Sequence, residues 1–117
     1  MNHRQRDRKF AKHGAEFGAS NSEEYERLAD EFLGGIVPDG IHEHTRPAGD
    51  RLRYDPQSEA FGVLDASGII RTFFRPVPCS SIADPRARAL AVASGLCHGH
   101  SNNLLYFQSE CGRIYGS

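Results

Sequence analysis

Residues 51–74 read RLRYDPQSEAFGVLDASGIIRTFF, and this stretch decides the fold class. Three short runs within it are rich in strand-forming residues: Arg51–Tyr54, Ala60–Leu64 and Ile69–Phe74. The residues between them, 55–59 and 65–68, include the Asp, Pro, Ser and Gly that are typical of turns. Because consecutive strands with such short connections pair antiparallel, the stretch predicts a β-meander.

A helix is predicted over residues 4–17, before the meander. Phe10, His13 and Phe17 are spaced three and four residues apart, which places them on one helical face. Gly18 follows at the position where helices commonly end in glycine.

A second helix is predicted immediately after the first. Ser20 and Glu23 have the spacing of a capping box, which starts a helix. An apolar stripe with helical spacing then follows: Tyr25, Leu28, Ala29, Phe32 and Leu33. Gly34 and Pro38 indicate its end.

The region after the meander is expected to hold one more helix and one more strand. Asp84 precedes Pro85 as a helix cap, so residues 86–94 are expected to be helical. Leu104–Phe107 is predicted as the last strand of the sheet. The sequence therefore predicts one α+β domain over 1–117, with two N-terminal helices packed on a small antiparallel sheet made of the meander and this final strand.

Composition excludes several classes of protein. With 117 residues the chain suits a single domain, and its 38% hydrophobic and 25% charged residues are typical of globular proteins. No apolar run approaches the roughly 20 residues of a membrane span, so no membrane anchor is expected, and no signal peptide is visible. Three cysteines cannot form a complete disulfide framework, although two of them could pair in an exported protein.

The net charge of −1 argues at first against a nucleic-acid-binding protein. The charges are segregated, however: residues 1–13 carry five basic residues against one acid, whereas residues 14–43 carry one arginine against eight acids. A local basic surface is therefore compatible with a total charge near zero.

The first candidate for chemistry is the group Lys9, Lys12 and His13 in the first predicted helix. Histidine exchanges a proton near neutral pH, and lysines supply positive charge, as cleavage of a phosphodiester requires. The same spacing also fits a helix that buries Phe10 and Phe17, with His13 at the core boundary and its lysines in solvent. Spacing alone favours this second, structural interpretation.

Arginines in and near the predicted sheet form a second candidate: Arg46, Arg51, Arg53, Arg71 and Arg75. The planar guanidinium group binds phosphate through two hydrogen bonds at once, and Thr72 adds a hydroxyl donor nearby. If the third strand is regular, Ile70, Thr72 and Phe74 face one way and Arg71 the other. The alternative is an exposed sheet face that charge protects from aggregation.

Cysteines and histidines form a third set: Cys79, Cys97, His98, His100 and Cys111, with His42 and His44 upstream. A zinc site needs about four convergent ligands, usually at recognisable spacing, and no second pair at such a spacing accompanies Cys97-His98-x-His100. Buried thiols and loop histidines are the favoured interpretation, so no metal and no cofactor are expected.

Several short motifs occur in an order that resembles a known family: Lys12-His13-Gly14-x-x-Phe17-Gly18, Arg53-Tyr54-Asp55, Phe61-Gly62-Val63, Gly68-x-Ile70-Arg71-Thr72-Phe73-Phe74 and Asn103-Leu104-x-Tyr106-Phe107. The chain resembles the RNase toxin domains of contact-dependent growth inhibition proteins and other polymorphic bacterial toxins. These are similar to the colicin D catalytic domain and belong with the barnase, EndoU, colicin and RelE-like (BECR) nucleases. Residues 77–97 depart from the compact pattern and are expected to be an insert.

The resemblance implies a metal-independent endoribonuclease that cleaves tRNA. It assigns His13 as general acid/base, Lys12 as electrostatic stabiliser, and Arg46 and Thr72 as residues that hold the scissile phosphate. Secondary substrate-binding candidates are Lys9, Arg51, Arg53 and Arg71. It also implies a cognate immunity protein and action in the bacterial cytoplasm, with delivery as the C-terminal part of a secreted toxin as one route.

Two other functions remain open at this point. One is a non-catalytic RNA-binding or phage structural module of the same fold, which would bind RNA without cleaving it. The other is a small protein stabilised by a metal at the late Cys/His cluster, which elemental analysis would test.

Overall fold

A computed structural model describes residues 2–113, and its centre is a four-stranded antiparallel sheet in the order β1-β2-β3-β4. The strands are β1 (His42–Thr45), β2 (Arg51–Tyr54), β3 (Phe61–Leu64) and β4 (Ile70–Phe74). The predicted meander is thus confirmed as β2 to β4. The fourth strand is β1 and not the predicted Leu104–Phe107. All four residues of β1 are exposed and polar, so its sequence lacks the apolar alternation that identifies a strand.

The β3–β4 pair contains an irregularity that decides where the residues of β4 point. Val63 lies opposite Thr72, but Leu64 lies opposite Ile70, so Arg71 is an extra residue in β4. As a consequence Ile70 and Phe73 belong to the same core cluster, and the regular alternation expected for this strand is wrong.

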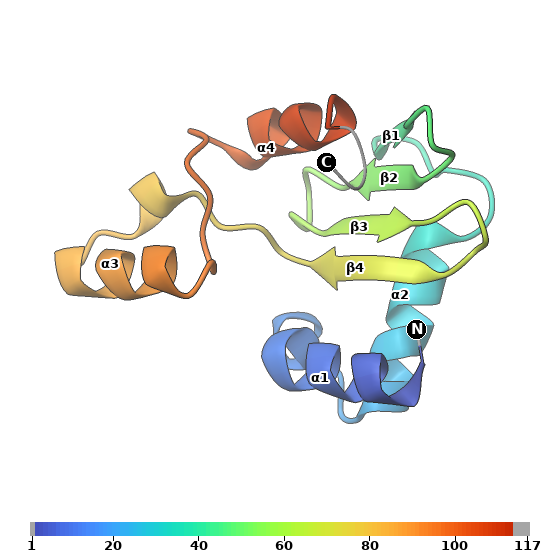
Figure 1. The fold of residues 1–117 in the computed structure, drawn as a ribbon, viewed down its shortest axis with the longest axis horizontal. Helices are drawn as coiled ribbons and strands as arrows, with labels where there is room; N and C mark the ends of the chain where they lie inside the picture. The colour runs from blue at the N-terminus through green and yellow to red at the C-terminus, as the bar shows by residue number, and fades with distance from the viewer. Residues whose placement is uncertain (1, 114–117) are drawn as a thin grey trace.

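Each face of the sheet carries its own hydrophobic core. On one face α2 (Ser22–Leu33) buries Tyr25, Ala29 and Leu33 against residues of β4. On the other face α4 (Asn103–Cys111) places Phe107 against a cluster of sheet residues: Leu52, Tyr54, Phe61 and Val63. Figure 1 shows α4 across the sheet from α1 and α2. The architecture is therefore α+β, with helices on both faces of the sheet.

The predicted first helix is two elements. α1 (His3–His13) ends at Gly14, and the chain tightens into the 3₁₀ helix η1 (Gly14–Phe17) before Gly18 takes a left-handed conformation with φ 67°. A Cβ atom at Gly14 would lie 2.4 Å from the Phe10 ring, so glycine lets that ring fold back over the helix end. This change of helix type redirects Glu16 relative to a continuous α-helix.

Helix α2 begins one residue later than predicted. Its N-cap is Asn21, whose side chain accepts a hydrogen bond from the Glu24 amide at 2.8 Å, rather than Ser20. The stripe that defined the helix is otherwise confirmed, since Tyr25, Ala29 and Leu33 are fully buried. Tyr25 also donates its hydroxyl proton to the Phe73 carbonyl, which ties α2 to β4.

The segment predicted as a final strand is α4. The side chain of Asn102 caps this helix by accepting a hydrogen bond from the Leu105 amide at 2.8 Å. Asn103 and Phe107, four residues apart, are the buried positions, which is a helical spacing. The four residues Leu104–Phe107 were too few to distinguish the two periods, and their burial depends on a sheet face that sequence does not show.

Between β4 and α4 the chain makes an excursion that a disulfide closes. Cys79 and Cys97 are bonded, and the adjacent backbone of Val77–Cys79 pairs with His98. The excursion contains η2 (Cys79–Ser81) and α3 (Pro85–Ala93), the latter capped by Asp84 as predicted. Figure 1 shows α3 extending away from the sheet. Among the described residues, no helix combines the length and apolar character needed to cross a membrane.

The disulfide predicts a definite thiol count. Unfolded, unreduced protein should titrate one thiol, that of Cys111, and three after reduction. Closing a loop of 18 residues should raise the free energy of unfolding by about 3 kcal/mol relative to a Cys79→Ser, Cys97→Ser double variant. Thiol titration and urea denaturation measure the two quantities. Three reactive thiols before reduction would contradict the bond.

Arg53 joins α2 to the sheet from inside the protein. It is 1% exposed, and its guanidinium donates to the carbonyls of Phe32, Gly34 and Gly35 at the end of α2. Its Nε donates to a Glu43 carboxylate oxygen at 2.9 Å. The terminal carbonyls of a helix lack intrahelical partners, so a buried cation there satisfies several acceptors together.

Replacing this cation should therefore strongly destabilise the fold. Arg53→Met is expected to lower the free energy of unfolding by about 3–5 kcal/mol, because the carbonyls and Glu43 lose their buried donor. Arg27→Met on the exposed face of α2 is the matched control, with an expected change within about 0.5 kcal/mol. Urea denaturation measures both, and equal stability of the two variants would exclude a structural role for Arg53.

Candidate active site

A cleft of about 580 Å³ lies beside the predicted catalytic histidine. The cleft has three walls. Helix α1 with η1 forms the first, and β4 with the residues after it forms the second. The excursion closed by the disulfide forms the third wall. The lining residues are Lys12, His13, Glu16, Thr72, Phe74, Arg75, Val77, Gly95 and Leu96.

Hydrogen bonds between side chains of α1 and η1 and the backbone of β4 and Arg75 set the position of this cleft. β4 is an edge strand, and its outer side faces α1. Lys9 Nζ donates to the Arg71 carbonyl at 2.7 Å, and a Glu16 carboxylate oxygen accepts from the Arg75 amide at 2.7 Å. These side chains satisfy backbone groups of the sheet edge and hold the helix against it.

Glu16 also orients His13. Its second carboxylate oxygen lies 2.5 Å from His13 Nδ1, so one carboxylate joins the histidine to the Arg75 backbone. The His13 ring packs on Phe74 with ring centroids 5.3 Å apart, and its side chain is 16% exposed. When Glu16 accepts a hydrogen bond from the Nδ1–H group of His13, the other ring nitrogen, Nε2, is left as a proton acceptor. The histidine lines the cleft.

Three of the four predicted catalytic residues meet in this cleft: Lys12, His13 and Thr72. Lys12 is exposed, and it immediately precedes His13 at the end of α1. Thr72 and Phe74 alternate with Phe73 along β4 and line the cleft together, whereas the irregularity at Arg71 places Ile70 in the core with Phe73. The arrangement provides a proton acceptor, a cation and a hydroxyl donor around one space.

Arg46, the fourth predicted catalytic residue, lies elsewhere. It is 6% exposed and donates from Nε to Asp50 at 2.6 Å and from Nη1 to the Glu110 carbonyl at 3.0 Å. A backbone hydrogen bond between Arg46 and Asp50 also closes the β1–β2 turn, with the Arg46 amide donating to the Asp50 carbonyl. Arg46 therefore ties this turn to α4 and does not line the cleft. The spacing of the sheet arginines in the sequence could not show which of them lies beside α1 and the His13 cleft.

Arg51 and Arg53 are also placed away from His13. Arg51 donates to the Leu33 carbonyl at 3.3 Å, and Arg53 is buried at the end of α2. Both pair with Glu43, a residue of β1. The structure thus gives these two predicted substrate-binding residues structural partners. Because β1 was not predicted, its carboxylate could not be anticipated as their neighbour.

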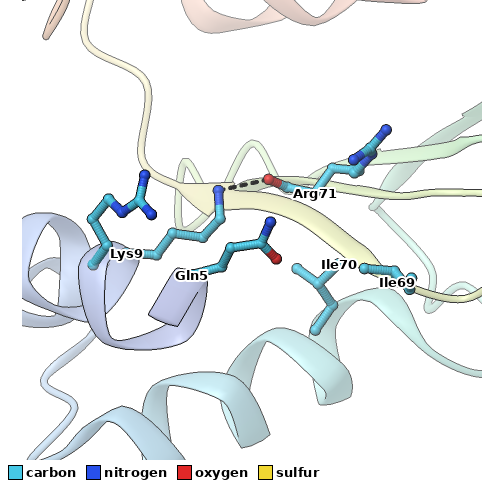
Figure 2. Close-up of a pocket in the computed structure, with 6 residues that line it drawn as sticks. Gln5, Lys9, Ile69, Ile70 and Arg71 are labelled. Carbon is cyan, nitrogen blue, oxygen red and sulfur yellow. Dashed lines mark hydrogen bonds between the residues drawn. The ribbon is translucent and has the colours of Figure 1, made fainter. Parts of the chain in front are cut away.

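Lys9 and Arg71 line a second, smaller cavity of about 240 Å³ between α1 and β4 (Figure 2). Gln5, Arg8, Ile69 and Ile70 complete its lining. This cavity lies one turn of α1 before His13 and next to the first residues of β4, so it continues the line of the catalytic cleft along the same helix and strand.

Glu16 and Arg75 were not predicted from sequence as members of the site. Glu16 is three residues from His13, which was a usable signal, but a carboxylate at that spacing is also common on solvated helix faces. Arg75 was one of the sheet arginines, and its guanidinium lies 5.0 Å above the Phe17 ring while the residue borders the cleft. Leu96 could not be predicted, since its return to the end of β4 depends on the disulfide and on the backbone pairing of Val77–Cys79 with His98.

Of the late cysteines and histidines, Cys79, Cys97, His98 and His100 make contacts with one another or with neighbouring residues, and Cys111 is a free thiol. Cys79 and Cys97 form the disulfide, and His98 lies 2.7 Å from the Asn103 side chain through Nε2. Its Nδ1 accepts from the His100 amide at 3.2 Å. Within residues 2–113, no group of three or more His, Cys, Asp and Glu side chains is arranged to hold a metal ion.

Comparison of the chain with protein-family models and with curated proteins finds no match, so the arrangement of His13, Glu16, Lys12 and Thr72 is what bears on function.

Proposed function

We propose that this protein is a metal-independent endoribonuclease toxin whose active site is the His13 cleft and whose substrate is tRNA. The observation that carries the proposal is the His13–Glu16 pair in a cleft that also contains Lys12 and Thr72. The substrate class and the toxin role come from the sequence resemblance, as do the immunity protein and the delivery route.

In the proposed reaction, His13 Nε2 takes the proton of a ribose 2′-hydroxyl, and the 2′-oxygen attacks the adjacent phosphorus. The bond between phosphorus and the 5′-oxygen breaks, and the leaving oxygen takes a proton from solvent in the open cleft. The products are a 2′,3′-cyclic phosphate and a 5′-hydroxyl end. Glu16 stabilises the imidazolium that forms and keeps the ring in one orientation, the role of the carboxylate in hydrolase triads.

The pentacovalent transition state carries additional negative charge on its non-bridging oxygens. Lys12 supplies a cation next to His13, and Thr72 supplies a hydroxyl from the opposite wall. Arg75 borders the same cleft and takes the role in phosphate binding that the resemblance had assigned to Arg46. A cavity of about 580 Å³ is within the range of pockets that hold small organic ligands, here a nucleotide unit of the RNA.

The proposal predicts cleavage of tRNA in the presence of EDTA. Wild-type protein should produce discrete fragments ending in 2′,3′-cyclic phosphate, and His13→Ala should lower the rate by about 10²–10⁴-fold because it removes the proton acceptor. His44→Ala, on the exposed strand β1, is the matched histidine control and should cleave normally. Gel electrophoresis and end-group analysis give the readout.

Intact tRNA after incubation with wild-type protein, or equal rates for the wild type and His13→Ala, would refute the catalytic role. Retention of tRNA binding without any cleavage would instead favour the non-catalytic RNA-binding module.

Glu16 is proposed as a positioning residue, and its effect should appear in kcat. Glu16→Gln is expected to lower kcat about tenfold, less than the loss for His13→Ala, since the imidazole remains and only its support changes. KM should stay within about twofold, because Glu16 is not proposed to bind the RNA. Glu24→Gln on α2 is the matched control. A rise in KM with unchanged kcat would assign Glu16 to RNA binding instead.

A further inference from the structure

A second cavity, with basic residues in its lining, lies between α1 and β4, the elements that also border the proposed active site. Its lining includes Arg8, Lys9 and Arg71, together with the amide of Gln5, in a space of about 240 Å³. Figure 2 shows Lys9 reaching from α1 to the Arg71 carbonyl, with Gln5 beside it and Ile70 below the strand. The guanidinium group of Arg71 extends from the strand on the far side from Lys9.

The residues around this cavity carry more positive than negative charge. Arg71 pairs with Asp65 at 3.6 Å, at the turn between β3 and β4. Lys9 uses one of its three donor positions on the Arg71 carbonyl, which is neutral, so the hydrogen bond leaves the ammonium charge uncompensated. Gln5 adds an uncharged amide that can donate or accept.

The pKa of Lys9 is consistent with crowded cations. Partial burial lowers this pKa, and the nearby charges of Arg8, Lys12 and Arg71 lower it further. The same residues that disfavour the protonated form of Lys9 would stabilise an anion placed among them. A phosphate group, with several acceptor oxygens, suits a site lined by the guanidinium-bearing Arg8, the ammonium-bearing Lys9 and the amide-bearing Gln5.

The position of the cavity specifies which phosphate it would take. Lys9 and His13 are four residues apart on α1, so their Cα atoms are separated by about 6 Å along the helix axis. Arg71 immediately precedes Thr72 on β4. The small cavity and the catalytic cleft therefore follow one another between the same helix and strand, so an RNA strand lying along them would pass both.

We infer that the cavity lined by Arg8, Lys9 and Arg71 is a second phosphate subsite, which holds a phosphodiester flanking the scissile one. This inference rests on the proposed function, because it treats the catalytic cleft as the place where RNA is cut. It gives Lys9 two roles, one in holding α1 to β4 and one in binding substrate.

The test uses tRNA and the full chain with two substitutions, Lys9→Gln and Arg8→Gln. Each is expected to weaken tRNA binding about three- to tenfold. In Arg8→Gln kcat should change little, since Arg8 does not line the catalytic cleft, whereas Lys9→Gln also removes the hydrogen bond to β4. In a His13→Ala background, each should also reduce the slope of log Kd against log salt by about 0.7–0.9, the value for a single phosphate contact. Arg27→Gln on α2 is the charge-matched control.

Two comparisons separate binding from folding. Arg8 is exposed, so Arg8→Gln tests the subsite even if Lys9→Gln loosens α1. Lys9→Arg keeps the charge and should restore affinity, whereas a position that matters only for its shape would not be rescued.

The outcomes distinguish failure of the subsite from failure of the proposed function. Unchanged affinity and salt slope in both Gln variants, with normal cleavage by the wild type, would overturn the subsite and leave the nuclease proposal intact. Reduced affinity and slope without cleavage by the wild type would support the subsite and refute the nuclease. Absence of tRNA binding by the wild type would overturn both.

Discussion

The covered edge of β4 is the constraint on which the rest of the site depends. An edge strand presents backbone donors and acceptors that need partners, and here side chains of α1 and η1 provide them. Glu16 has to reach the Arg75 amide, and this fixes the carboxylate that then orients His13. The cleft is therefore a product of how the protein closes its sheet, and the polar residues that close it are also the residues proposed to carry the chemistry.

Burial separates two kinds of arginine that look alike in sequence. Arg46 and Arg53 are almost completely buried, and each donates hydrogen bonds to backbone carbonyl oxygen and to a carboxylate within the fold. A buried guanidinium without partners would be costly, so those contacts are part of the fold's stability. Arg75 and Lys12 are exposed, and their charge is available at the cleft. Phosphate recognition is accordingly proposed for the exposed cations beside α1.

The excursion after β4 shapes the cleft rather than the sheet. Val77 and Leu96, near the two ends of this excursion, both line the cleft, and the disulfide between Cys79 and Cys97 keeps those ends together. α3, in contrast, projects from the sheet and leaves Leu90 and Val92 exposed. The part of the excursion that bears on the proposed site is thus its base, where the chain leaves β4 and returns.

Local sequence determined the elements whose residues carry their own periodic pattern. The apolar stripe of α2, the turn-rich connections of β2 to β4 and the Asp84-Pro85 start of α3 were all predictable, because each depends on neighbours in the chain. The same holds for Lys12 and His13, which are adjacent in α1.

Tertiary structure decided what local pattern cannot express. Exposed β1 and the helix α4 depend on a sheet edge and a sheet face made elsewhere, and the extra residue at Arg71 moves Ile70 away from Thr72 and Phe74 and into the core with Phe73. Whether an arginine binds a helix end, a turn or a cleft likewise depends on contacts between residues distant in sequence, since burial and hydrogen bonding are properties of the packed chain.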